Sequence, residues 1–227
     1  MRSKIISIPP HIQIYETRIK ILQAYLQNDL AEEKRLLKYL LEHIYNTPSL
    51  SFKNGLTGTG WILAFLFENN HNHFNYQHIL TEIDDIVYKW VILDKNLSFS
   101  IEYGYLGILC YFYLRLKKWH GSYYQELALK ECSIIILGRL LHEAQKQNQA
   151  KLSPIEWIVL QILAMLFKRL QLQKNLPQKI LQETHKQIPT MKAYLKQLDL
   201  TTKRQKYLYK LLENTPNVRF WKFLFIN

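Results

Sequence analysis

A pair of glycines three residues apart occurs twice in this chain and opens an apolar run of helical length each time. The first copy, NGLTGTGWILAFLF, covers residues 54–67, and the second, YGYLGILCYFYLRL, covers residues 103–116. Gly104 lies 49 residues after Gly55, and Gly107 lies 49 residues after Gly58. A repeat of this length predicts an array of similar helical units that stack on one another.

The rest of the chain alternates between amphipathic stretches and apolar runs, both at helical spacing. A third apolar run, IEWIVLQILAMLFKRL, covers residues 155–170. Ser153 lies 49 residues after Gly104, so the third unit keeps the period without its glycines. Ser153 is a suitable helix N-cap, and Pro154 suits the first helical position. An amphipathic stretch, which we expect to form one helix, precedes each apolar run, and the three stretches span residues 15–45, 76–93 and 123–147.

This order predicts an all-α fold of helical hairpins in two layers. Apolar helices would form the inner layer and amphipathic helices the outer layer, as in a helical solenoid or a partial α/α toroid. The chain has 227 residues, 48% of them hydrophobic, which is enough for one core. We expect the partial toroid to span residues 1–170. A basic helical extension over residues 171–227 should pack on the same domain.

Glycines at the start of an inner helix allow a neighbouring backbone or loop to come close, because they have no side chain. We therefore favour a packing role for them over contact with a ligand. The free amides of a helix start can hold an anion, but no Walker sequence accompanies them. The glycines that mark the structural repeat are Gly55, Gly58, Gly60, Gly104 and Gly107.

The ordered set of residues in the first unit resembles the lanthionine synthetase C-like family. An inner helix with the pattern Phe-x-x-Gly-Leu-x-Gly-x-Gly-Trp precedes an outer helix with the pattern Ile-Leu-x-Glu-Ile-Asp. The resemblance covers residues 49–116 well and the flanking helices loosely. The matching residues are Phe52, Gly55, Leu56, Gly58, Gly60 and Trp61, then Ile79, Leu80, Glu82, Ile83 and Asp84.

The resemblance implies an α/α toroid of nested helices. Catalytic members of the family bind zinc through one Cys and a later Cys-His pair that is followed by Gly. The metal activates a peptide cysteine thiolate, which adds to a dehydrated Ser or Thr and closes a thioether ring. Zinc suits this chemistry because it accepts thiolate and imidazole ligands and leaves one position open for the substrate sulfur.

The chain departs from this pattern at the metal site. It contains no Cys-His-Gly sequence, Cys110 lies inside an apolar run after Gly107, and Cys132 lies in an amphipathic stretch. We therefore carry over neither the zinc ligands nor the cyclase activity, and we expect no catalytic residue, no metal ligand and no cofactor. The expected function is that of a non-catalytic accessory or scaffold protein in the maturation of a ribosomally made, lanthipeptide-type peptide.

Two alternative functions stay open. Glu102 and Glu156 both lie near the start of an inner helix, and two carboxylates across a cleft are what a metal-independent, glycosidase-like enzyme needs. Glu102 is equally suited to a helix cap or dipole partner. The other alternative is an active cyclase component that needs a partner chain.

Several other side chains are weighed as sites. Trp61, Tyr103 and Tyr105 would form the rim of a peptide-binding groove, or pack in the core. Cys110 has apolar neighbours and is interpreted as a buried structural thiol. His71, His73 and His78 lie close together, but no Cys or acid at ligand spacing completes a metal site. The acidic residues Glu82, Asp84 and Asp85 are interpreted as a solvated helix face.

The net charge of +12 is concentrated in the extension, where residues 171–227 hold eleven Lys or Arg against three acids. No nucleic-acid motif accompanies it, so we expect no nucleic-acid partner. A solvated helix face is the simplest reading of this charge, and an acidic leader peptide or a modifying enzyme is a suitable partner. The open side of a half toroid also invites a second copy of the chain.

The opening MRSKIISIPP lacks the apolar stretch of a secretory signal, and the most apolar segments are too short or too interrupted to span a bilayer. The two cysteines do not make a disulfide framework. We therefore expect a cytoplasmic protein with reduced thiols and no membrane partner.

Overall fold

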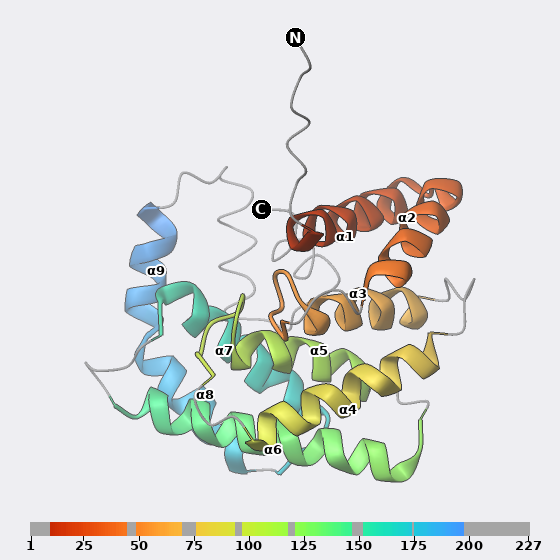
Figure 1. Ribbon diagram of the computed structural model, residues 1–227. Helices are drawn as coiled ribbons and strands as arrows, with labels where there is room; N and C mark the ends of the chain where they lie inside the picture. The colour runs from red at the N-terminus through yellow and green to blue at the C-terminus, as the bar shows by residue number, and fades with distance from the viewer. Residues whose placement is uncertain are drawn as a thin grey trace.

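The computed structural model describes residues 10–44, 49–69, 76–93, 97–117, 121–146, 152–173 and 175–197 (Figure 1). These ranges consist of helices and short loops, and their only strand-type pairing is an isolated bridge between Ser98 and Gly104. The prediction of an all-α fold is confirmed. The helices are α1 (Pro10–Gln27), α2 (Leu30–His43), α3 (Leu56–Glu68), α4 (Gln77–Leu93), α5 (Tyr105–Lys117), α6 (Tyr123–Ala144), α7 (Pro154–Arg169), α8 (Asn175–Lys186) and α9 (Ile188–Gln197).

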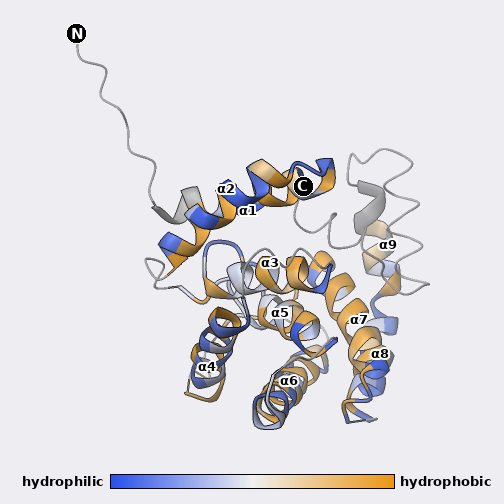
Figure 2. Ribbon diagram, turned by 90° about the vertical axis from the view of Figure 1, so that its right-hand side faces the viewer, coloured by the Kyte–Doolittle hydropathy of each residue, from blue (hydrophilic) through white to orange (hydrophobic). Residues whose placement is uncertain are grey.

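The helices alternate between two layers. Helices α3, α5 and α7 pack next to one another in chain order, and α4, α6 and α8 form a second row against them (Figure 2). Each inner helix is joined to an outer helix by a short connection, so every unit is a helical hairpin. The predicted inner and outer helices are therefore present. Their closure into a toroid stays a prediction.

Burial explains why the two kinds of helix differ in sequence. Every residue of α3 from Leu56 to Leu66 and every residue of α5 from Tyr105 to Leu116 is buried, so these helices carry apolar side chains all round. Outer helices bury one stripe, and these stripes keep the 49-residue period. The stripe of α4 is Leu80, Ile83, Val87 and Val91, and that of α6 is Leu129, Cys132, Ile136 and Leu140.

The prediction of one continuous helix over residues 15–45 is wrong at a single point, because α1 and α2 are separate helices. Asn28 adopts a φ of 56°, in the left-handed region that asparagine tolerates better than most residues. Asp29 then caps α2 by accepting a 3.1 Å hydrogen bond from the backbone N–H of Glu32. A left-handed residue followed by a new N-cap ends one helix and starts the next.

The third inner helix, α7, is capped differently from the first two. Ser153 caps α7, Pro154 takes its first position, and the side chain of Glu156 accepts a 2.7 Å hydrogen bond from the backbone N–H of Ser153. Ser153 and Glu156 stand 49 residues after Gly104 and Gly107. The predicted cap is confirmed, and a capping box stands where the earlier units have glycines.

The start of the basic extension belongs to the same body of helices. Helix α8 packs against α6 and α7, in the outer row, and α9 follows it after Gln187. The buried residues of α8 are Pro177, Ile180 and Thr184. The remaining residues of the extension, 198–227, lie outside the described part of the chain.

Candidate functional site

A pocket lies where α1 crosses the start of α3, and it encloses about 70 Å³. Four segments form its wall: α1, the loop before α3, the first turns of α3, and the loop before α5. The wall combines aromatic, aliphatic and charged side chains. The residues are Tyr15, Arg18, Ile19, Leu22, Phe52, Lys53, Gly58, Trp61, Ile62, Ile101 and Glu102.

Arg18 joins α1 to the loop before α3. Its Nη1 donates a 3.0 Å hydrogen bond to the carbonyl of Phe52, and its Nη2 donates to the carbonyl of Lys53. Arg18 is only 7% exposed, and within the described residues it forms no ion pair with an acid. Burial lowers the pKa of Arg18 to about 10, partly opposed by nearby Tyr15, so the guanidinium is still charged at neutral pH.

The glycines of the first inner helix let this loop lie directly on the helix. A Cβ on Gly58 would lie 1.9 Å from the carbonyl oxygen of Phe52 and 1.7 Å from Nη1 of Arg18. A Cβ on Gly55 would lie 2.1 Å from the carbonyl oxygen of Ser49. Any side chain at either position would therefore move the loop that carries Phe52 and Lys53.

The second unit repeats this geometry at equivalent positions. A Cβ on Gly104 would lie 2.0 Å from the Ser98 carbonyl oxygen, and one on Gly107 would lie 2.2 Å from that of Ile101. The N–H of Tyr105 donates to the Ser98 carbonyl at 2.9 Å. The N–H of Leu56 donates to the Ser49 carbonyl at the same distance, 49 residues earlier.

The remaining glycine of the repeat, Gly60, has a different neighbour. A Cβ on Gly60 would lie 2.7 Å from the ring of Tyr111, on α5. Gly60 therefore sets the close packing of α3 against α5. The steric role of all five glycines is to admit a loop or a ring.

The two loops at the mouth of the pocket are tied together. The backbone N–H groups of Phe52 and Lys53 donate to the carbonyl of Glu102 at 2.8 and 3.1 Å. The Nζ of Lys53 also lies 3.0 Å from Oε1 of Glu102, and this hydrogen bond raises the pKa of Lys53 above its ordinary value. Lys53 and Glu102 occupy equivalent positions of the two units, since they are 49 residues apart.

The aromatic part of the wall is continuous with the core. Trp61 is 2% exposed, stacks on Phe65 at 5.3 Å between ring centroids, and meets Phe52 edge-on at 6.2 Å. Tyr15 covers the outer side, where the Nζ of Lys53 lies 6.0 Å from its ring centroid. The pocket therefore combines buried aromatic rings with a charged mouth.

The three aromatic residues predicted as a rim do not line this pocket together. Trp61 is in its wall, but Tyr103 is 54% exposed and Tyr105 is 1% exposed. The hydroxyl of Tyr105 accepts a hydrogen bond from Arg139, and its ring lines another pocket with Phe99 and Gly138. The residues that do accompany Trp61 come from α1 and the two loops.

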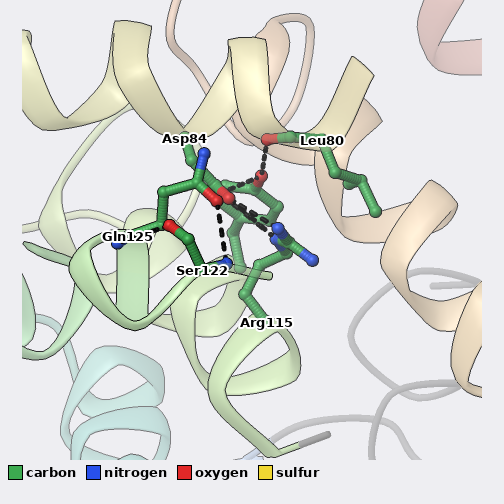
Figure 3. A network of polar contacts seen from close by, with 6 residues as sticks. Leu80, Asp84, Arg115, Ser122 and Gln125 are labelled. Carbon is green, nitrogen blue, oxygen red and sulfur yellow. Dashed lines mark hydrogen bonds and ion pairs between the residues drawn. The ribbon is translucent and has the colours of Figure 1, made fainter. Parts of the chain in front are cut away.

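A buried ion pair replaces the solvated face predicted for part of α4. Asp84 is 3% exposed, and Nη2 of Arg115 donates to its Oδ2 at 2.6 Å while the hydroxyl of Tyr111 donates to Oδ1 at 2.6 Å. Figure 3 shows Arg115 facing Asp84, with Leu80 beside them. The prediction for Asp84 is wrong because this residue lies on the buried stripe of α4, whereas Asp85 is exposed.

The electrostatics of this network follow from its partners. Burial acts to lower the pKa of Arg115, but the facing Tyr111 and Asp84 raise it above its ordinary value. Burial raises the pKa of Tyr111 most, and Asp84 adds to this effect. Arg115 is therefore a charge neutralised inside the fold, unlike Arg18.

Both cysteines are inside the fold. Cys110 and Cys132 have no exposed surface, and burial raises the pKa of both thiols, to about 12 for Cys132. The interpretation of Cys110 as a buried thiol is confirmed. Their positions in the interior of α5 and α6 are unsuited to a substrate-accessible metal.

The other predicted candidates have structural neighbours. Glu102 pairs with Lys53, and Glu156 belongs to the cap of α7. His78 is exposed and lies 3.4 Å from Glu82, while His71 and His73 lie outside the described residues. No group of three His, Cys, Asp or Glu side chains suited to a metal ion occurs in the described ranges.

Sequence reasoning missed Arg18, which is central to the pocket. A signal existed, because Arg18 lies four residues after Ile14 and four before Leu22, on the stripe that α1 buries. A charged residue at a buried stripe position requires a polar partner. Asp84 carries the same signal on α4.

None of the described helices has the length and apolar content that crossing a bilayer requires. Comparison of the chain with models of protein families, with curated proteins and with solved structures gives no match.

Proposed function

We propose that this chain is a non-catalytic, cytoplasmic accessory protein that binds a peptide in the maturation of a ribosomally made peptide. The observation that carries the proposal is the pocket between α1 and α3. Its wall supplies aromatic rings, the two cations Arg18 and Lys53 and the acid Glu102, and it includes no Ser, Thr, Cys or His side chain. Such a surface can hold a peptide side chain.

The resemblance to the lanthionine synthetase C-like family supplies the biological setting of the proposal. Two observations support it. The hydrogen bonds and close glycine contacts recur at equivalent positions of two units, and apolar helices form an inner row behind amphipathic ones. The buried positions of both cysteines support a role without the family's thiolate-ligated metal.

Selection of peptides from a displayed random library on the pure protein tests this proposal. Selected peptides should bind the wild-type chain and lose most of their affinity for Lys53→Ala, because Lys53 stands at the mouth of the pocket. Lys117→Ala is the matched control. Lys117 pairs with Glu68, also 49 residues apart, at the opposite ends of α3 and α5.

Two results count against the proposal. Peptides that bind both variants as they bind the wild type do not use this pocket. A library that yields no binder at all removes peptide binding from the account. Fluorescence anisotropy of each labelled peptide gives the affinities.

A further inference from the structure

Among the described residues, no acid lies within ion-pair distance of Arg18, although Glu102 lines the same pocket. Its guanidinium donates to two backbone carbonyls and lies 5.9 Å from the centroid of the Tyr15 ring, and its Nε has no hydrogen-bond partner in the described part of the chain. The two carbonyl oxygens accept hydrogen bonds from Arg18, but they carry no formal charge and so do not neutralise the guanidinium. A buried cation of this kind is costly unless an anion reaches it.

A second buried arginine, Arg115, has a different environment. Arg115, 3% exposed, faces the carboxylate of Asp84 through hydrogen bonds of 2.6, 3.0 and 3.2 Å. Both arginines lie on apolar helix faces, yet of the two only Arg115 is paired with an acid from the described ranges. The missing acid distinguishes Arg18 and places an unbalanced positive charge in the wall of a cavity.

We propose that the pocket between α1 and α3 binds one carboxylate group through Arg18, supplied by an aspartate or glutamate side chain of the peptide partner. The identity of that partner as a peptide rests on the proposed function. The carboxylate enters past Lys53 and Glu102, and its aliphatic stem lies against Phe52 and Trp61. The acidic side chain is therefore the specificity element of the peptide.

The charge balance selects a carboxylate over a phosphate. Arg18 and Lys53 contribute two positive charges and Glu102 one negative charge, so the wall carries a net charge of one. A single carboxylate neutralises it. A phosphate dianion would leave one negative charge beside Glu102. The cavity, about 70 Å³, also suits a small group on an apolar stem.

Two small probes that differ in one group test the proposal. N-acetyl-aspartate N-methylamide and N-acetyl-asparagine N-methylamide are titrated into the full chain at neutral pH and low salt, with ligand-observed NMR as readout. We expect the aspartate probe to bind at least tenfold more tightly. Equal binding of the two probes, or tighter binding of inorganic phosphate than of the aspartate probe, overturns the proposal.

A variant that gains affinity separates binding from folding. Glu102→Gln removes the carboxylate that competes at the mouth and frees Lys53, so the aspartate probe should bind roughly two- to fivefold more tightly. Glu68→Gln, in the equivalent pair at the far end of α3, should leave binding unchanged. Weaker binding to Glu102→Gln overturns the proposal. Arg18→Met should lose at least tenfold, provided that circular dichroism shows a folded chain.

The outcomes also separate this inference from the proposed function. If selected peptides depend on Lys53 while the two probes bind equally, peptide binding stands and the carboxylate inference fails. If the aspartate probe binds selectively while no selected peptide depends on Lys53, the carboxylate site stands and the proposed function fails.

Discussion

At the scale of single residues, the two buried arginines show how position decides role. Arg115 is balanced by Asp84 and Tyr111, so it stabilises the contact between α4 and α5. Arg18 instead donates to backbone carbonyls, lies beside the ring of Tyr15 and lines a pocket. The equivalent positions of the next unit hold Ser133 and Ala164, 49 residues after Asp84 and Arg115, so the ion pair belongs to one unit alone.

Removing one partner of this ion pair should strongly destabilise the fold. Asp84→Asn leaves the buried charge of Arg115 without its counter-ion, and we expect the free energy of unfolding to fall by about 3–5 kcal/mol. The double variant Asp84→Leu, Arg115→Met should recover most of the loss, because neither charge remains. Urea titrations followed by circular dichroism measure both. A double variant as unstable as Asp84→Asn would contradict this interpretation.

Gly107 and Gly138 both lie inside helices, so the same substitution to alanine can be compared at the two positions. A Cβ on Gly107 would lie 2.2 Å from the Ile101 carbonyl oxygen and 2.5 Å from Cβ of Phe52, so Gly107→Ala should cost about 2–3 kcal/mol. A Cβ on Gly138 meets nothing within 4 Å, so Gly138→Ala should stabilise α6 by about 0.5–1 kcal/mol. Thermal melts of both variants give the comparison. Equal effects would mean that glycine packing has no special role in α5.

At the scale of elements, the helices follow the sequence pattern closely, since apolar periodicity and caps are local signals. The start of α7 could be predicted because Ser153, Pro154 and Glu156 form a complete capping signature. The break before α2 was missed although Asn28-Asp29 precedes Glu32 at capping-box spacing. The apolar stripe continues before and after Asn28-Asp29, so periodicity alone predicts one helix.

Two substitutions at the break between α1 and α2 should change the stability of the fold in different ways. Asn28 has a left-handed backbone and Asp29 is an N-cap, so Asn28→Gly should be neutral or stabilising and Asp29→Ala should cost about 1 kcal/mol. A continuous helix would reverse both effects, because alanine favours a helix interior and glycine does not. Thermal unfolding of the two variants decides between them.

The pocket was harder to predict than the helices. Trp61 and Glu102 were singled out, but only the packing of α1 on the start of α3 adds Arg18 and Tyr15 to them. That contact joins residues more than thirty positions apart, through the hydrogen bond from Arg18 to Phe52. Long-range pairing of this kind leaves no periodic trace in a single sequence.

At the scale of the whole molecule, the core is continuous from α1 to α9, and both cysteines lie within it. Their raised pKa values favour the thiol over the thiolate in the folded chain, whereas an unfolded chain has ordinary values. Thiol reactivity therefore reports opening of the core rather than surface chemistry.

Labelling kinetics should follow this rule. At pH 8 the folded chain should react with a thiol reagent at least a hundredfold more slowly than the chain in urea, because the thiolate fraction and access are both reduced. Mass spectrometry after quenching counts the labelled sites. Rapid labelling of Cys110 in the folded chain would contradict its burial.

The central claim is that the pocket between α1 and α3 is where this protein binds its peptide. Hydrogen exchange of the full chain, with and without a selected peptide, tests it most directly. We expect slower exchange in the loops at residues 49–55 and 97–104, with α6 unchanged. Protection confined to α4 and α6, with both loops unaffected, would contradict it.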